Sequence, residues 1–497
     1  MRRSGFLIPV SLAVLALVLV LLAISEEQPS LAVYRQPEEW TGQITHTVSL
    51  PHVTRNYDPV YTVSLPLVTR AYDPAYVPPF GIVMYGSVND AAGLQSMQQA
   101  GAKWASTMFT WATVEPQPGA YDWSLFDAKA AGAQAAGMSL FVLFTGNPRW
   151  AADLPGGPVT HTQDLVNIVT RMAERYDCDG KDDAAGHPCV HYWSFYAEPD
   201  NGNYLRAKNT GKGYWGHNGA GYAAMLSEIS PAIHAANAKA KVLIGGLAYD
   251  WFEEQAGPFV RSFLTDTLQA LNGYPGGAPA YIDAVAFHYY PLNPEWPTIK
   301  EKAAEFRGIM ANWGAAELPL LCPETGYWSS LSHGSSEEQQ AYWLVQLMVR
   351  GISVDVQVIS WHKVFDDVVP GSPDDKYPTR TSGLLRLDRS FKPSYYAYQT
   401  VTRELTGLHY AGALEAAGVE GYVFITGRGK DKTVLWGLSD PRRVTFPYTH
   451  LRLVRATGEE YDIRDNEPTV PGDLDGGVPG QIELEFSAGE PFFVEQK

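Results

Sequence analysis

The stretch Val190-His-Tyr-Trp-Ser-Phe-Tyr-Ala-Glu198-Pro-Asp200 is a short apolar run that ends in a carboxylate. A second stretch of the same kind, Leu318-Pro-Leu-Leu-Cys-Pro-Glu324, follows later in the chain. Short apolar runs rich in β-branched and aromatic residues are typical of buried strands. We therefore expect Glu198 and Glu324 at the C-terminal ends of two strands.

Around these two stretches the chain alternates between strand patterns and helix patterns. We expect strands at 80–85, 104–109, 139–144, 191–197, 241–245, 284–287, 318–322 and 356–361, and helices at 91–101, 124–136, 163–176, 219–237, 258–272, 297–313, 336–350 and 393–405. Such alternation favours an α/β fold, and eight units fit a (β/α)8 TIM barrel better than an open sheet. No glycine-rich phosphate loop follows the first strand, which argues against a dinucleotide-binding fold. We place the barrel at 79–406.

The pattern changes after residue 406. Short strand-like runs at 421–426, 433–437, 443–448, 451–454, 460–463, 481–486 and 491–495 are separated by Gly, Pro and Asp turns. Short strands at such spacing predict a small β-sandwich over 407–497. A structural accessory to the barrel is favoured over a carbohydrate-binding module.

The N-terminus has the pattern of an export signal. Arg2 and Arg3 precede an apolar run from Phe6 to Ile24. Residues 1–25 are expected to be a cleaved signal peptide or a retained signal anchor, because about 20 apolar residues can span a bilayer. Residues 26–78 are proline-rich and contain a two-copy repeat, so we expect an extended stalk. The remaining chain would lie outside the cytoplasm, either secreted or anchored to the membrane.

Composition limits the partners. The chain of 497 residues carries 37 basic and 54 acidic residues, a net charge of -17. Nucleic acid and anionic membrane surfaces are therefore disfavoured as partners. Cys178 and Cys189 flank one loop, where a disulfide and two free thiols are equal alternatives, and Cys322 is expected to be a buried hydrophobe. The acidic run 177–183 lacks the spacing of a calcium loop, so we predict no metal. No organic cofactor is implied.

Paired carboxyls suggest hydrolysis of a glycosidic bond. A retaining glycosidase needs two carboxyl groups about 5–5.5 Å apart. Glu198 follows the fourth expected strand and Glu324 the seventh, so both would face the mouth of a barrel. Further motifs accompany them: Trp111-Ala-Thr-Val-Glu115-Pro-Gln-Pro-Gly119-Ala-Tyr-Asp-Trp123, Gly146-Asn-Pro148-Arg-Trp150, Phe287-His288-Tyr289-Tyr290-Pro, Pro323-Glu324-Thr-Gly-Tyr, Trp361 and Lys392-Pro-Ser-Tyr-Tyr-Ala-Tyr398.

In this order, the motifs resemble those of clan A, the (β/α)8 retaining glycoside hydrolases. Family 39, with its β-xylosidases, is the most similar, and family 5 follows. The resemblance implies that Glu198 is the acid/base and Glu324 the nucleophile, acting on an oligo- or polysaccharide. It further implies a set of substrate-binding residues, namely His288, Tyr290, Trp361, Asn147, Trp150, Trp328 and Trp111.

One departure from the clan pattern keeps alternatives open. Ala197 stands where the clan has an Asn that holds the sugar 2-hydroxyl, unless Asn147 or Asn201 replaces it. Such a bond strengthens in the transition state, so its loss weakens catalysis. A non-catalytic glycan-binding protein on a degenerate barrel is the first alternative. A structural cell-surface protein, with the repeat as its working part, is the second.

Overall fold

The computed structural model describes residues 77–202, 215–426, 431–439, 441–467 and 471–497. The expected signal at 1–25 and all but the last two residues of the expected stalk at 26–78 lie outside the described residues. The described chain divides into two compact units, with the main break between Thr406 and Gly407. Each unit is described below by itself.

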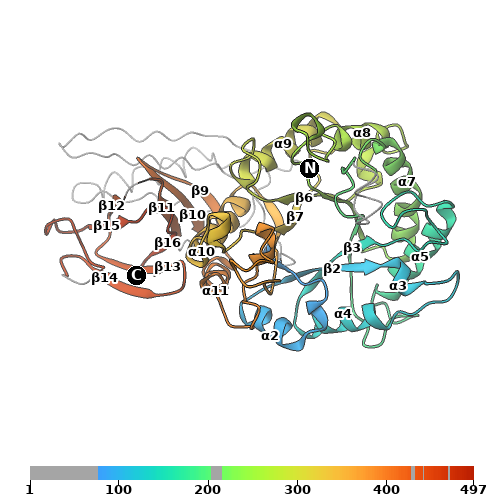
Figure 1. Ribbon diagram of the computed structural model, residues 1–497. Helices are drawn as coiled ribbons and strands as arrows, with labels where there is room; N and C mark the ends of the chain where they lie inside the picture. Colours follow the sequence, from blue (N-terminus) through green and yellow to red (C-terminus); the bar gives the residue numbers. More distant parts are fainter. Residues whose placement is uncertain (1–76, 203–214, 427–430, 440, 468–470) are drawn as a thin grey trace, which may run out of the picture. The chain divides into compact units, whose positions relative to one another are not determined.

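The first unit is a closed barrel of eight parallel strands, each paired with its neighbours in chain order (Figure 1). This confirms the TIM barrel. Its strands are β1 (Phe80–Val83), β2 (Trp104–Thr110), β3 (Ser139–Thr145), β4 (Tyr192–Phe195), β5 (Lys241–Leu247), β6 (Ala284–Tyr289), β7 (Leu320–Thr325) and β8 (Val356–Trp361).

Helices surround these strands in Figure 1. They are α2 (Ala91–Gln99), α3 (Trp111–Val114), α4 (Ser124–Ala135), α5 (Thr162–Arg175), α7 (Gly219–Ala236), α8 (Phe263–Leu271), α9 (Ile299–Asn312), α10 (Glu337–Ser353) and α11 (Pro393–Leu405). The start predicted for α8, at residue 258, is wrong. Residues 258–260 instead bond to the loop after β4, where Gly202 N donates to Pro258 O and Val260 N to Asp200 O.

The interior of the barrel is packed with side chains. Six of the eight strands contribute to one buried cluster, made of Trp104, Phe141, Leu243, Ala284, Ala286, Leu321 and Val358. Burying a large apolar side chain contributes about 1.5–3 kcal/mol. The barrel is therefore a solid core that holds the strand ends in place, and chemistry belongs at its rim.

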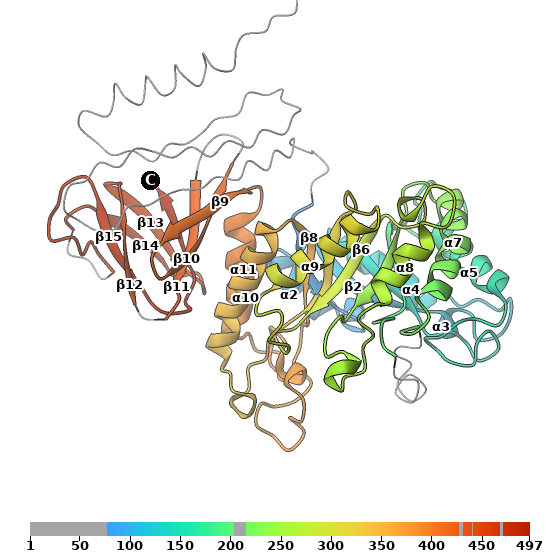
Figure 2. The same ribbon diagram turned by 90° about the horizontal axis from the view of Figure 1, so that it is seen from above.

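The second unit contains antiparallel sheets (Figure 2). One sheet has six strands in the order β14-β13-β16-β11-β10-β9, and the other pairs β12 with β15. Both contribute to one apolar core, in agreement with the predicted sandwich. The strands are β9 (His409–Ala416), β10 (Val419–Ile425), β11 (Asp431–Gly437), β12 (Arg442–Phe446), β13 (His450–Arg455), β14 (Glu460–Arg464), β15 (Ile482–Phe486) and β16 (Phe492–Gln496).

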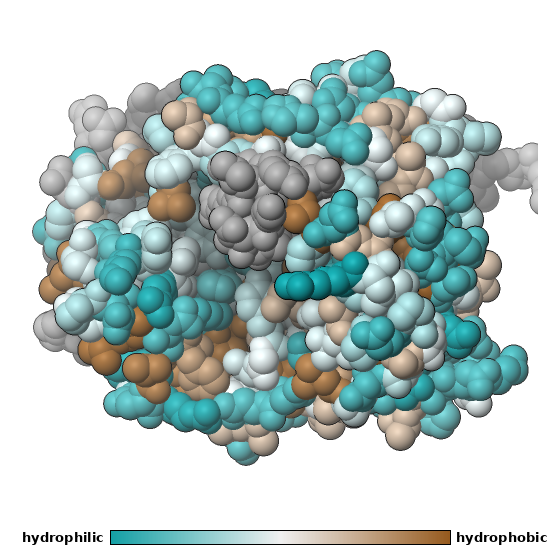
Figure 3. Space-filling model, turned by 45° about the vertical axis from the view of Figure 1, so that its right-hand side comes forward, coloured by the Kyte–Doolittle hydropathy of each residue, from teal (hydrophilic) through white to brown (hydrophobic). Residues whose placement is uncertain are grey.

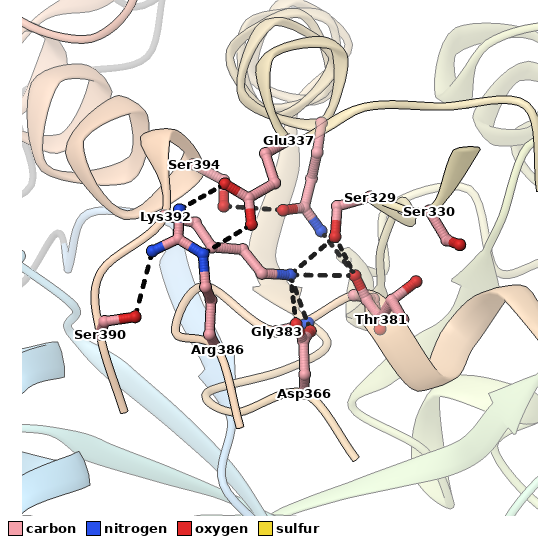
Figure 4. A network of polar contacts seen from close by, with 12 residues as sticks. Ser329, Ser330, Glu337, Asp366, Thr381, Gly383, Arg386, Ser390, Lys392 and Ser394 are labelled. Carbon is pink, nitrogen blue, oxygen red and sulfur yellow. Dashed lines mark hydrogen bonds and ion pairs between the residues drawn. The ribbon is translucent and has the colours of Figure 1, made fainter. Parts of the chain in front are cut away.

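A buried ion pair lies within the segment between β8 and α11, and a hydrogen bond from the same lysine ties this segment to the loop after β7 (Figure 4). Lys392 Nζ lies 2.7 Å from the Asp366 carboxylate, and neither side chain is exposed. Nζ also donates to Ser329 Oγ at 2.8 Å and to Thr381 O at 3.2 Å. Removing one member of such a pair costs about 3–5 kcal/mol, because the other charge stays buried. We name this set the Lys392 clasp.

The three cysteines differ in state. Cys178 and Cys189 form a disulfide with their Cα atoms 5.1 Å apart. Cys322 is buried and free, and burial raises the pKa of its thiol. A thiol held neutral in this way is a poor nucleophile.

Among the described residues, the helices are too short or too polar to cross a bilayer. On the face in Figure 3, hydrophobic residues are scattered among hydrophilic ones. Scattered exposed apolar residues need no partner to explain them.

Candidate active site

Glu324 is held by two phenol groups. It lies inside β7, which ends at Thr325, three residues beyond the predicted strand end at residue 322. Tyr290, just after β6, donates its hydroxyl to Glu324 Oε1 at 3.0 Å. Tyr85, two residues after β1, donates to Glu324 Oε2. Both carboxylate oxygens therefore accept a hydrogen bond, and these bonds favour the ionised form that a nucleophile requires.

The two tyrosines stay protonated. Burial, and then the negative charge of Glu324, raise the pKa of both hydroxyls well above the usual value. The charge of Glu198 raises the pKa of both hydroxyls as well. Tyr85 and Tyr290 therefore donate to Glu324 as neutral phenols.

Glu198 is placed by a sharp turn of the backbone. β4 ends at Phe195, earlier than predicted, and Tyr196 and Glu198 have φ angles of +61° and +46°. Non-glycine residues avoid this left-handed region, which costs of order 1 kcal/mol or more for each residue. Glu198 N donates to Gly246 O at 3.0 Å, which holds the turn. Strained residues of this kind are concentrated at functional sites.

His288 is buried beside Glu198. Its Nδ1 atom lies 3.4 Å from Glu198 Oε1. The backbone partner of His288 on β7 is Glu324, so the imidazole lies between the two glutamates along the rim. A neutral imidazole nitrogen can accept from a carboxylic acid, and an N–H can donate to a carboxylate. His288 is therefore able to contact Glu198 in both protonation states.

Comparisons with known proteins bear on the fold of the barrel. The family model described as beta-galactosidase, glycoside hydrolase family 42, matches residues 89–155. A family 39 glycoside hydrolase from Bacteroides cellulosilyticus superposes with a TM-score of 0.63 at 18% identity, covering 86% of this chain and 83% of its own. The fold is that of clan A. No curated protein matches the chain by sequence.

Two further clan A structures show the same likeness. A family 39 β-xylosidase from Caulobacter crescentus has a TM-score of 0.55 at 16% identity and covers 85% of this chain and 98% of its own. A family 30 endoxylanase from Clostridium papyrosolvens has a TM-score of 0.54 at 12% identity and covers 85% of this chain and 97% of its own. Likeness at such identity establishes the clan A fold alone.

Two adjacent glycines in β5 make room for this clan A rim. A Cβ on Gly245 would lie 2.1 Å from Tyr196 O, and one on Gly246 would lie 2.2 Å from His288 Nε2. Side chains at these positions would collide with the turn that carries Glu198 and with the imidazole beside it. The glycine pair is therefore required for the placement of Glu198.

Gly246→Ala is expected to lower stability by about 1–3 kcal/mol, the usual cost of overpacking, and to displace His288. Gly308→Ala is the matched control, because a Cβ there meets nothing within 4 Å in the exposed part of α9. Replacing a helical glycine by alanine stabilises by about 0.5–1 kcal/mol. Urea unfolding of both variants checks the prediction, and equal stability of the two would contradict it.

Three predicted binding residues are buried and serve packing. Trp361 is fully buried, and its indole N–H donates to Ser382 O at 2.8 Å. Trp111 is also fully buried and donates to Glu115 Oε2 at 2.8 Å. Neither ring presents a face to a sugar, because each lies inside the core with its N–H occupied. Trp361, which we predicted to be a sugar platform, is thus a packing residue in this structure.

The side-chain amide of Asn147 is likewise hydrogen-bonded within the protein. Its amide donates to Gly157 O at 2.8 Å and accepts from the Tyr196 hydroxyl at 3.0 Å. It therefore shapes the loop after β3 instead of offering a bond to the substrate. Asn201 is fully buried as well. The amide of Asn147 is thus already used within the protein.

Trp150 and Trp328 are half-buried, so part of each ring is accessible. Trp150 donates its indole N–H to Glu115 O at 3.1 Å, and Trp328 donates to His333 O at 2.7 Å. Trp328 also stacks on Tyr327, with centroids 4.4 Å apart. Fixed rings with an open face are suited to stacking on a sugar.

Two site residues were missed in the sequence. Tyr85 bonds to Glu324, and His362 lies beside both tyrosines, with its ring centroid 6.0 Å from Tyr85 and 6.4 Å from Tyr290. Both follow a strand end directly, which is where a barrel presents its functional groups. That position is the signal that would have identified them. His362 occupies the rim place that we expected for Trp361.

A buried carboxylate supports the loop after β5. Asp200 accepts from Ala248 N at 3.1 Å and Tyr249 N at 2.7 Å, while Lys302 Nζ donates to Ala248 O at 2.6 Å. Burial raises the pKa of Asp200 to about 7; the backbone N–H of Tyr249 opposes this rise, and the charge of Glu198 adds to it. Asp200 thus links the turn at Glu198 to β5.

This raised pKa predicts a pH dependence of stability. A folded-state pKa of about 7 for Asp200 exceeds its ordinary value of 3.8, so the folded state binds the proton more tightly. Relative to Asp200→Asn, the wild type should lose up to about 4 kcal/mol of unfolding free energy as the pH rises from 4 to 7. Denaturant unfolding of both proteins at pH 4, 5.5, 7 and 8 measures this difference. A difference independent of pH would disprove the assignment.

Proposed function

We propose that the protein is a retaining glycoside hydrolase that cleaves a β-linked glycan by double displacement. The observation that carries this proposal is the pairing at the barrel mouth. Glu324 accepts hydrogen bonds from two phenols, while Glu198 lies at a strained turn with His288 at 3.4 Å. Two carboxyl groups in unlike surroundings suit the two roles of a retaining mechanism.

In the first step, Glu324 attacks the anomeric carbon while Glu198 donates its proton to the leaving oxygen. The sugar–oxygen bond breaks as the glycosyl–Glu324 ester forms. The hydroxyls of Tyr85 and Tyr290 hold the attacking carboxylate in one orientation. Such positioning lowers the entropic cost of reaching the transition state.

In the second step, Glu198 is a carboxylate and acts as the base. It takes a proton from water as the water attacks the anomeric carbon, and Glu324 leaves as a carboxylate. His288 is able to donate a hydrogen bond to Glu198 in this state. The sugar is released with its original anomeric configuration.

The half-buried aromatic rings are proposed to bind the sugars. Trp150 and Trp328 present partly open faces, and His362 takes the rim place beside the nucleophile. The relatives named above are described as β-xylosidase, endoxylanase and beta-galactosidase. We therefore propose a β-linked polysaccharide or its oligosaccharides as the substrate class.

The second candidate is a glycan-binding protein without turnover. Ala197 favours it, because the side-chain amide of Asn147 is already bonded to Gly157 O and to the Tyr196 hydroxyl. This protein would bind oligosaccharides saturably and release no sugar. We further propose that the protein acts outside the cytoplasm, supported by the basic and apolar N-terminal run and by the Cys178–Cys189 disulfide.

Reducing-sugar release by the full chain from a panel of β-glycans and aryl β-glycosides tests the proposal. Release by the wild type, with none from Glu324→Ala, would support the hydrolase and name its sugar. Binding of an oligosaccharide by both proteins without any release would favour the second candidate instead.

A further inference from the structure

An acidic loop joins α5 to β4, far from the glutamates along the strand. Asp177, Asp179 and Asp183 each bring a carboxylate oxygen to within 4.8 Å of the others. Two ligands on opposite sides of a calcium ion, each at about 2.4 Å, would be about 4.8 Å apart. The three oxygens are thus close enough to share one ion.

One oxygen in this loop has no N–H or hydroxyl donor among the described residues. The side chain of Asp183 is only 1% exposed. Its Oδ2 accepts from Gly180 N at 2.9 Å and contacts His187 Nδ1 at 2.7 Å. Its Oδ1 is buried and accepts no hydrogen bond from an N–H group or hydroxyl of the described residues, and the side chain that contacts Asp183 from within the cluster is the carboxyl of Asp177. A buried carboxylate oxygen without such a donor is costly, and an unseen ion is a recognised explanation.

We propose that this loop is a calcium site with Asp177, Asp179 and Asp183 as ligands. The donors are all carboxylate oxygens, which calcium and magnesium prefer. Zinc is disfavoured, because Cys178 and Cys189 are joined in the disulfide and offer no thiolate. Magnesium demands a near-ideal octahedron of ligands, whereas calcium accepts the irregular geometry of a surface loop.

The loop is already shaped for an ion. Asp177 Oδ1 accepts from Asp179 N at 3.0 Å, and Asp179 Oδ1 accepts from Lys181 N at 2.8 Å. The disulfide ties the loop at Cys178, between the first two ligands. Lys181 Nζ lies 3.5 Å from Asp179 Oδ2, and both side chains are exposed. Because this surface ion pair is weak, a divalent ion would displace Lys181 from Asp179.

The role of this ion would be structural. The chain continues from this loop to β4, and Val190 N, two residues before the strand begins, donates to Tyr176 O at 2.9 Å. Glu198 follows the opposite end of the same strand, so the ion would not contact the substrate. It would fix the entry of the chain into β4 and stabilise the barrel. This inference does not depend on the proposed hydrolase activity.

Calorimetric titration of the full chain, freed of metal with a chelator, tests the site. We expect one calcium ion to bind, and the unfolding midpoint to rise by about 5 °C at 100 times Kd. Magnesium at the same concentration should give a smaller rise. Asp183→Asn and Asp177→Asn should each lose binding and the rise in midpoint, which keeps the test valid if one variant fails to fold.

Asp182→Asn is the matched control. Asp182 lies in the same loop but is exposed and is outside the three-carboxylate group. It should bind calcium like the wild type. No calcium binding by the wild type would overturn the proposal, and so would unchanged binding by Asp183→Asn and Asp177→Asn or loss of binding by Asp182→Asn.

Discussion

Glu324→Ala is expected to lower kcat/KM by about 10⁴-fold or more, because no glycosyl–enzyme ester forms without the nucleophile. The variant should remain folded, since a smaller side chain at the rim leaves the barrel core intact. Initial rates on an aryl β-glycoside measure the loss, and thermal unfolding checks the fold. Glu338→Ala, an exposed glutamate in the first turn of α10, is the control and should keep wild-type rates.

Azide makes this prediction specific to the nucleophile. The space left by Glu324→Ala admits a small anion, which would attack the anomeric carbon from the side of the missing carboxylate. The product would be an α-glycosyl azide, inverted relative to the β-substrate. Recovery of rate with a β-configured azide product would show that Glu324 is not the nucleophile.

Glu198→Ala is expected to lose activity in proportion to the difficulty of the leaving group. General acid catalysis contributes about 10²–10⁴-fold, and a natural glycan needs that proton. An aryl group that leaves readily needs little proton donation from Glu198. The formation of the glycosyl–enzyme ester from such an aryl glycoside should therefore slow by less than about 10-fold in the variant. Comparing kcat/KM for a series of aryl glycosides with that for an oligosaccharide gives the measurement.

The azide product again separates the two roles. In Glu198→Ala, Glu324 still forms the ester, and azide would attack this intermediate to give a β-glycosyl azide with retained configuration. A loss that is equal for every leaving group would argue against Glu198 as the acid. A structural defect would appear instead in the unfolding midpoint.

Much of the barrel could be predicted, because each strand and helix carries its own period of apolar residues. The two glutamates could be found because each directly follows an apolar run. The turn at Tyr196 could not, since its left-handed backbone depends on Gly245 and Gly246 in another strand. No local pattern in residues 190–200 carries that information.

The rim residues show the same limit. A shift of one residue along a strand end exchanges a buried side chain for one at the site, and the sequence does not fix such a shift. Trp361 and His362 are neighbours, yet one is packed and the other faces the tyrosines. Strand β9 was missed because Ala and Gly, weak strand formers, make up half of its eight residues.

The Lys392 clasp restricts local opening of the barrel rim near Glu324. Both charges lie in the segment between β8 and α11 and are fully buried, so any local opening of this segment must separate or hydrate them. Amide hydrogens beside the clasp, such as that of Gly383, which bonds to Asp366, should then exchange with solvent only when the barrel unfolds as a whole. The loop segment near Glu324 would therefore keep the same structure when a sugar binds. Any adjustment to the sugar would occur in the other loops of the rim.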